Sequence, residues 1–177
     1  MYKRCFEING NLFDDDNGLR NSKDFLEVIV SVKNIYDIIF GREIMDKYDL
    51  YVDNATENSG YTPITTVILQ KYVIIKLGIT IESPRSTIAF QFSHELTHFV
   101  FCSYFGLNKP PANYMEEIIC TAASLIIIRM LFPTEFEWWD NYVRCLDKEY
   151  YKQGADYAEQ LEYNLENIKN KIIGFKY

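Results

Sequence analysis

The residues best suited to chemistry are two histidines four positions apart, His94 and His98, and they are the only histidines in the chain. Residues at this spacing lie one turn apart on the same helix face, so both imidazoles can bind one metal ion. Zinc would take two of its tetrahedral positions from these rings, leaving the others for a third protein ligand and for water. Glu95 completes the pattern HExxH, and a carboxylate beside the metal can act as general base toward water. The pattern therefore predicts a zinc site with His94 and His98 as ligands and Glu95 as catalytic base.

Two neighbouring glutamates, Glu116 and Glu117, compete for the role of third ligand. If Asn113 caps a helix that begins here, Glu116 occupies the third helical position and fits a capping box, which is a structural role. Glu117 instead shares a helix face with Thr121, one of the few polar residues of an otherwise apolar helix, as a buried metal site would require. We therefore predict Glu117, nineteen residues after His98, as the third zinc ligand, with Glu116 as the alternative.

A hydrolase also needs a hydrogen-bond donor for the oxyanion of the transition state, and no third histidine is present to supply it. Tyr114, one turn before Glu117, is the first candidate, and Arg129 and Tyr72 are weaker ones. Strands before the HExxH helix could bind an extended peptide by adding it to the edge of a sheet. A protein or peptide is therefore the expected substrate.

The helices that hold these side chains can be placed from the signals at their ends. Ser83 as cap and Pro84 at the first position predict the start of the HExxH helix, and Gly106 predicts its end. The next helix is expected from about Asn113 to Pro133, which cannot continue a helix. Because this helix is apolar on nearly every face, we expect it to run through the middle of the fold.

The remaining elements follow from the periodicity of apolar residues. A first helix is expected from Asn21 to Gly41, where the helical spacing ends at a glycine. Residues 48–81 are rich in β-branched and aromatic residues and predict two or three strands. Their pairing stays open, because Gln70-Lys71 is unfavourable for a two-residue hairpin. Two further amphipathic helices are expected, over 136–151 and along 158–172.

Together these elements predict one α+β domain over residues 1–177, with a small antiparallel or mixed sheet packed on the HExxH helix. It divides into an N-terminal helix region (1–45), strands (48–82), metal-site helices (83–132) and C-terminal helices (134–177).

Three segments, of which the first contains the HExxH motif, are similar to a known family: Arg85-Ser-Thr-Ile-Ala-Phe-Gln-Phe-Ser-His-Glu-Leu-Thr-His, then Glu116-Glu-Ile-Ile-Cys-Thr-Ala-Ala-Ser, and later Leu131-Phe-Pro. HExxH followed by eighteen residues and a glutamate resembles the gluzincin pattern, and the segments resemble the ImmA/IrrE-type metallopeptidase domain over about residues 79–133. The resemblance implies a zincin-like fold and one zinc ion held by His94, His98 and Glu117, with Glu95 as base. It also implies a regulatory protein, such as a transcriptional repressor, as substrate.

A second interpretation stays open. The chain could keep the zincin-like fold and act as a non-catalytic binding or regulatory module in a mobile-element or stress-response system, because a fold does not by itself imply turnover. The two interpretations differ in whether the zinc-loaded protein hydrolyses peptides.

Composition argues against several other functions. The formal net charge is −7 with no block of Lys and Arg, so we do not expect direct nucleic-acid binding. The first residues lack an apolar signal, and the longest apolar run begins at Ile118 and is interrupted at Arg129, too short to span a bilayer. We therefore expect a cytoplasmic protein without membrane association; the sequence does not predict its oligomeric state.

The scattered cysteines are expected to be reduced packing residues rather than metal ligands. They are Cys5, Cys102, Cys120 and Cys145.

Overall fold

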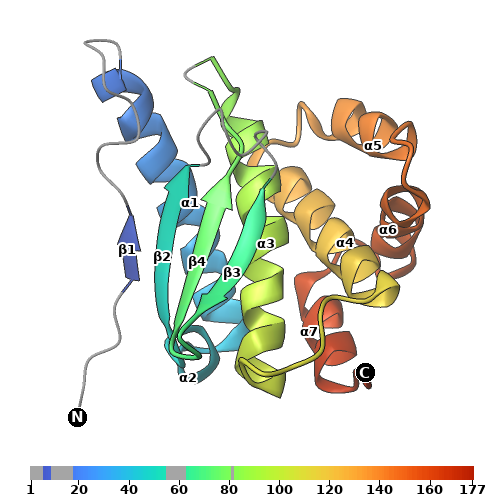
Figure 1. The fold of residues 1–177 in the computed structure, drawn as a ribbon. Coiled ribbons are helices and arrows are strands. Elements are labelled where there is room, and N and C mark those ends of the chain that lie inside the picture. Colours follow the sequence, from blue (N-terminus) through green and yellow to red (C-terminus); the bar gives the residue numbers. More distant parts are fainter. Residues whose placement is uncertain (1–5, 9–17, 55–62, 81) are drawn as a thin grey trace.

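The computed structural model describes residues 6–8, 18–54, 63–80 and 82–177, and these form seven helices and a four-stranded sheet (Figure 1). The helices are α1 (Gly18–Phe40), α2 (Arg42–Met45), α3 (Arg85–Phe105), α4 (Tyr114–Leu131), α5 (Phe136–Arg144), α6 (Glu149–Gln160) and α7 (Leu165–Ile173). The strands are β1 (Phe6–Ile8), β2 (Asp49–Asn54), β3 (Ile64–Ile68) and β4 (Tyr72–Leu77). The predicted α+β class is confirmed. Within the described ranges, no helix combines the length and the apolar character needed to cross a membrane.

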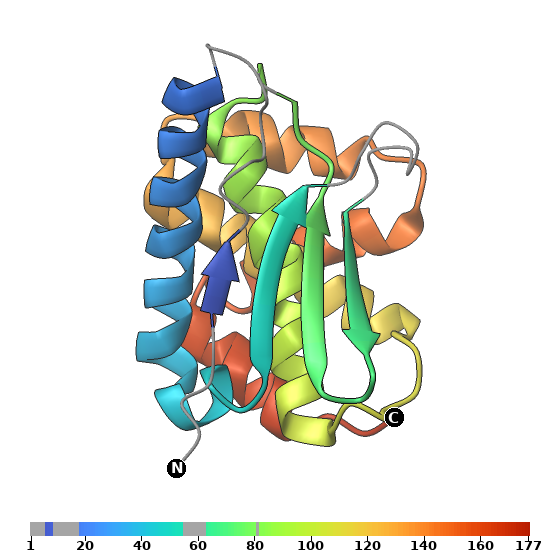
Figure 2. The same ribbon diagram turned by 60° about the vertical axis from the view of Figure 1, so that its left-hand side comes forward.

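The sheet is mixed and has the strand order β1-β2-β4-β3. β1, β2 and β4 run parallel to one another, and β3 runs antiparallel to β4. Helices lie against one face of this sheet (Figure 2). Alternate residues of a strand point to the same face, and β4 accordingly buries Val73, Ile75 and Leu77. β3 ends the sheet and contacts α3, the helix that carries HExxH.

β3 and β4 form a hairpin in which Ile68 lies opposite Tyr72. The turn between them contains Leu69 and Gln70, whose φ angles are 53° and 51°. Residues other than glycine adopt this left-handed region at a cost of about 1–2 kcal/mol each. The turn therefore lacks the residues that usually mark a hairpin, which is why the pairing could not be predicted.

α3 begins one residue later than predicted and ends at the predicted place. Pro84 is its N-cap residue, because the Pro84 carbonyl accepts the first helical hydrogen bond, from the amide of Thr87 at 3.0 Å. The prediction of Ser83 as cap is wrong, since the Ser83 hydroxyl accepts a hydrogen bond from the amide of Thr80 at 2.8 Å instead. Gly106 ends the helix with a φ of 92°, which glycine adopts without strain.

α4 begins and ends as predicted. The side chain of Asn113 accepts a hydrogen bond from the backbone amide of Glu116 at 3.0 Å, and the helix stops at Leu131, just before Pro133. α4 contacts α3 and also α6 (Figure 1), so its apolar faces are buried by neighbours on more than one side. The helix therefore runs through the helical layer, as its composition predicts.

α1 packs against α3 close to the HExxH motif. It begins at Gly18, before the predicted start at Asn21, and ends at the predicted Gly41, whose φ is 85°. The fully buried Tyr36 hydroxyl donates to the carbonyl of Ser93 at 3.0 Å and lies 2.8 Å from the Thr97 hydroxyl. α1 is thus hydrogen-bonded to α3 at Ser93 and Thr97, the residues that directly precede the two histidines.

The C-terminal part differs from the prediction of two helices. It forms α5, α6 and α7, because the chain leaves the helical conformation after Arg144 and again at Glu162 and Tyr163, which have φ angles of 57° and 51°. The apolar series at Ala158, Leu161, Leu165, Ile168 and Ile172 is buried, so it packs onto the rest of the described chain.

α6 approaches α4 closely at Gly154. A Cβ there would lie 2.5 Å from Cβ of Thr121 and 3.2 Å from the carbonyl oxygen of Ile118. Gly154→Ala is expected to lower the free energy of unfolding by about 1–3 kcal/mol, because overpacking outweighs the higher helix propensity of alanine. Thermal or denaturant unfolding measures the change. Gly174→Ala is the control, since its Cβ would come no closer than 3.5 Å to another atom; equal loss in both variants would contradict this packing.

Candidate metal centre

His94 and His98 lie on one face of α3, with ring centroids 5.1 Å apart. Glu117 reaches both rings from α4: its Oε2 lies 3.2 Å from Nε2 of His94, and its Oε1 lies 3.5 Å from Nε2 of His98. Zinc bonds of about 2.0–2.1 Å place two tetrahedral ligands about 3.3–3.4 Å apart. The structure therefore brings the three predicted ligands together, and both separations between Glu117 and the histidines are close to this value.

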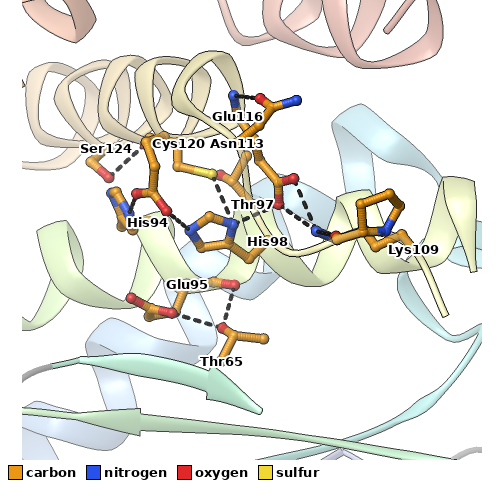
Figure 3. Close-up of polar contacts among 12 residues, drawn as sticks. Thr65, His94, Glu95, Thr97, His98, Lys109, Asn113, Glu116, Cys120 and Ser124 are labelled. Carbon is orange, nitrogen blue, oxygen red and sulfur yellow. Dashed lines mark hydrogen bonds and ion pairs between the residues drawn. The ribbon is translucent and has the colours of Figure 1, made fainter. Parts of the chain in front are cut away.

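Glu116 has a different role from the predicted capping box. Its backbone amide does bond to the Asn113 cap, but its fully buried carboxylate turns toward His98 and lies 2.8 Å from Nδ1 of that ring (Figure 3). The same carboxylate accepts hydrogen bonds from Lys109 Nζ at 2.9 Å and from the Tyr177 hydroxyl at 2.6 Å. The side-chain part of the capping-box prediction is wrong, because tertiary packing offers this buried carboxylate three donors.

The charges around His98 are matched. Nδ1 of His98 faces Glu116 and Nε2 faces Glu117; with the Nδ1 proton held by Glu116, Nε2 is the ring nitrogen that would bind a metal ion in place of its proton. Burial alone lowers the pKa of His98, but the neighbouring thiol and carboxylates raise it well above its ordinary value. Burial alone would raise the pKa values of Glu116 and Glu117. Hydrogen bonds outweigh this effect, from His98, Tyr177 and Lys109 to Glu116 and from both histidines to Glu117, so that both pKa values lie below their ordinary value. Both carboxylates are therefore ionised at neutral pH, and the pocket favours a cation.

Cys120 adds a possible ligand that the sequence did not favour. It is fully buried, and its Sγ lies 3.5 Å from Nδ1 of His98. His94, His98 and Cys120 form a group whose ligand atoms all lie within 4.8 Å of one another and that could hold a metal ion. Burial raises the pKa of the Cys120 thiol to about 12. Cys120 is buried as expected for a packing residue, and this grouping also makes it a second candidate, beside Glu117, for the third ligand. Cys102 and Cys145 are free thiols, and Cys5 lies outside the described residues.

Glu95, the predicted base, lies on the side of His98 that faces β3 (Figure 3). The Thr65 hydroxyl donates to its carboxylate at 2.8 Å and to its backbone carbonyl at 3.0 Å. Thr65 belongs to the edge strand β3, so this strand is tied to the HExxH helix at the predicted base. Sequence patterns did not indicate this contact, because it joins two elements through a long-range packing arrangement.

A cavity of about 440 Å³ opens at this centre. Its walls include the predicted ligands and base from α3 and α4, Thr65 and Val67 from β3, and Tyr150 and Tyr151 from α6. The volume lies within the range of small-molecule and peptide-side-chain sites. Three separate parts of the chain therefore meet around one space beside the histidines.

Tyr114, the predicted oxyanion donor, is not among the cavity-lining residues. It is 48% exposed, and its ring contacts Tyr150 edge to face. The weaker candidates also lie elsewhere: the guanidinium of Arg129 lies 4.3 Å from the ring centroid of Tyr163, and Tyr72 belongs to β4. The structure thus brings together the metal and base residues but none of the predicted oxyanion donors.

The tyrosines that do reach the cavity are Tyr150 and Tyr151, whose ring centroids lie 4.5 Å apart. Burial raises the pKa values of both, so their hydroxyl groups stay protonated and can donate hydrogen bonds. No local spacing marks these residues, because they reach the site only through the packing of α6 on α4.

Comparison with known proteins identifies no relative: no protein-family model, no curated protein and no solved structure matches this chain.

Proposed function

We propose that this chain is a zinc-dependent peptidase in which His94, His98 and Glu117 bind one zinc ion and Glu95 acts as general base. The observation that carries the proposal is the approach of one Glu117 carboxylate to Nε2 of both histidines, at 3.2 and 3.5 Å. The adjoining cavity of about 440 Å³ leaves room for substrate and water. The α+β fold, with an antiparallel edge strand beside the HExxH helix, is compatible with a zincin-like architecture.

We favour Glu117 over Cys120 as the third ligand because they lie on opposite sides of the His98 ring. Cys120 is near Nδ1, and that nitrogen already donates to Glu116 at 2.8 Å. A ring nitrogen that holds a proton for a carboxylate has no lone pair left for a metal ion. Glu117 faces the Nε2 atoms of both histidines and borders the cavity, whereas Cys120 is not a lining residue.

In the proposed reaction, bound zinc would act as a Lewis acid that polarises the scissile carbonyl and lowers the pKa of water. Glu95 takes a proton from the attacking water and passes it to the leaving amine. Thr65 holds the Glu95 carboxylate at 2.8 Å and so positions it beside the histidines. The substrate is expected to lie along β3, because an extended peptide can add to a sheet edge and side chains of β3 line the cavity.

The resemblance to ImmA/IrrE-type domains suggests the substrate class. We propose a regulatory protein, such as a transcriptional repressor, that presents an extended segment to the β3 edge. A protein substrate also agrees with an open site bordered by a strand rather than an enclosed pocket for a small molecule.

Tyr150 is the best-placed donor for the oxyanion. It lines the same cavity as Glu117, His98 and Glu95, and its hydroxyl stays protonated because burial raises its pKa. Tyr150→Phe is expected to lower kcat about 10²- to 10³-fold, as for loss of one oxyanion donor, with little change in KM or zinc content. Tyr114→Phe is the matched control and should retain full kcat. A normal kcat in Tyr150→Phe would assign the donor elsewhere.

The direct test of the proposed function is to combine elemental analysis with a peptide-library cleavage assay. The purified protein should contain one zinc ion per chain, hydrolyse a subset of peptides, lose hydrolysis on chelation and regain it when zinc is restored. A protein without bound transition metal would refute the metal site. Stoichiometric zinc without cleavage of any library peptide would support the alternative, a non-catalytic module.

A further inference from the structure

The carboxylate of Glu116, beside the metal centre, is contacted by hydrogen-bond donors from three different residues. It is fully buried and contacts His98 Nδ1 at 2.8 Å, both oxygens lie 2.9 Å from Lys109 Nζ, and one accepts from the Tyr177 hydroxyl at 2.6 Å. A buried carboxylate with several donors has little freedom to rotate. The orientation of the His98 ring therefore depends on groups that hold Glu116 in place.

One of these groups comes from the segment after α7. Tyr177 packs its ring against Phe101, Phe105 and Phe175, with centroid separations of 6.5, 5.3 and 5.0 Å. Lys109 Nζ lies 5.2 Å from the centroid of the same ring. The aromatic contacts hold the ring on α3, and the hydroxyl is thereby aimed at Glu116.

We infer that Tyr177 is a positioning residue of the metal site: its hydroxyl fixes Glu116, Glu116 fixes the His98 ring, and docking of residues 175–177 thereby strengthens zinc binding. This inference rests on the proposed zinc site at His98. Carboxylates that hold a metal-binding histidine typically raise metal affinity about 10- to 100-fold. Coupling between two sites is reciprocal, so bound zinc must also strengthen the docking of residues 175–177.

Tyr177→Phe isolates the hydroxyl group, because phenylalanine retains the ring contacts with Phe101, Phe105 and Phe175. The zinc affinity, measured by competition with a chelating dye, is expected to fall about tenfold, the lower end of the range for such partners. The matched control is Tyr104→Phe. Tyr104 is partly buried on α3, and the pKa of its hydroxyl is raised by burial and by the carboxylates of Glu43 and Glu166, not by Glu116. The control should bind zinc like the wild type.

The reciprocal effect gives a second readout. Zinc should slow amide hydrogen exchange in residues 175–177 of the wild type, and this protection should be much smaller in Tyr177→Phe. Equal zinc affinities of Tyr177→Phe and wild type, or equal protection in both, would overturn the inference. A thermal unfolding curve of the metal-free variant that matches the wild type would exclude a general loss of stability as the cause.

The outcomes also separate this inference from the proposed function. A wild type that binds zinc but hydrolyses no peptide would refute the peptidase and leave the role of Tyr177 intact. Normal hydrolysis together with unchanged zinc affinity in Tyr177→Phe would refute only the role of Tyr177. A wild type that binds no zinc would overturn both.

Discussion

Glu95→Gln is expected to bind zinc with wild-type stoichiometry and to lose peptide hydrolysis by about 10²- to 10⁴-fold, the usual contribution of a general base. Glutamine has the shape of glutamate and can still accept the hydrogen bond from Thr65, which lies 2.8 Å from Oε2 in the wild type. It cannot take a proton from water. Because Glu95 is not one of the proposed ligands, the metal site should remain intact.

His98→Ala is the contrasting variant and should lose both zinc and hydrolysis. It removes a proposed ligand and also leaves the buried Glu116 carboxylate without one of its donors. Elemental analysis and initial cleavage rates, measured on the same preparations, distinguish the two variants. Full activity in Glu95→Gln would assign the base to another residue, and retained zinc in His98→Ala would place the metal elsewhere.

The second large effect concerns the identity of the third ligand. Glu117→Gln is expected to lower zinc affinity by more than about 100-fold, because loss of a direct ligand should exceed the 10- to 100-fold loss found for outer partners. Cys120→Ala should bind zinc with near wild-type affinity. The reason is geometric: Glu117 faces the Nε2 atoms at 3.2 and 3.5 Å, whereas Cys120 lies beside Nδ1 of His98, which bonds to Glu116.

The same pair of variants tests the competing site. If Cys120→Ala loses zinc and Glu117→Gln retains it, the metal is held by His94, His98 and Cys120, a group whose spacing could also accommodate an ion. In such a site Cys120, which does not line the cavity, would take the place of Glu117 as the third ligand beside His94 and His98. Thermal unfolding of both metal-free proteins controls for the small cavity that Cys120→Ala creates in the core.

The amino-acid sequence determined those features that depend on neighbours within one or two helical turns. The four-residue spacing of His94 and His98 places both rings on one face of α3, because helical geometry alone sets this relation. The cap at Asn113 and the helix end at Gly106 follow from local hydrogen bonding and backbone freedom. Local signals are absent at the Leu69 turn, and for this reason the pairing of β3 with β4 could not be predicted from the sequence.

Only the tertiary structure decided how the two neighbouring glutamates divide their roles. Glu116 and Glu117 are adjacent in sequence, yet the packing of α4 on α3 directs one to Nδ1 of His98 and the other to the Nε2 atoms. Tyr150 and Tyr177 reach the centre from α6 and from the segment after α7 in the same way. These contacts depend on the packing of many side chains that are distant in sequence, so no short pattern of residues encodes them.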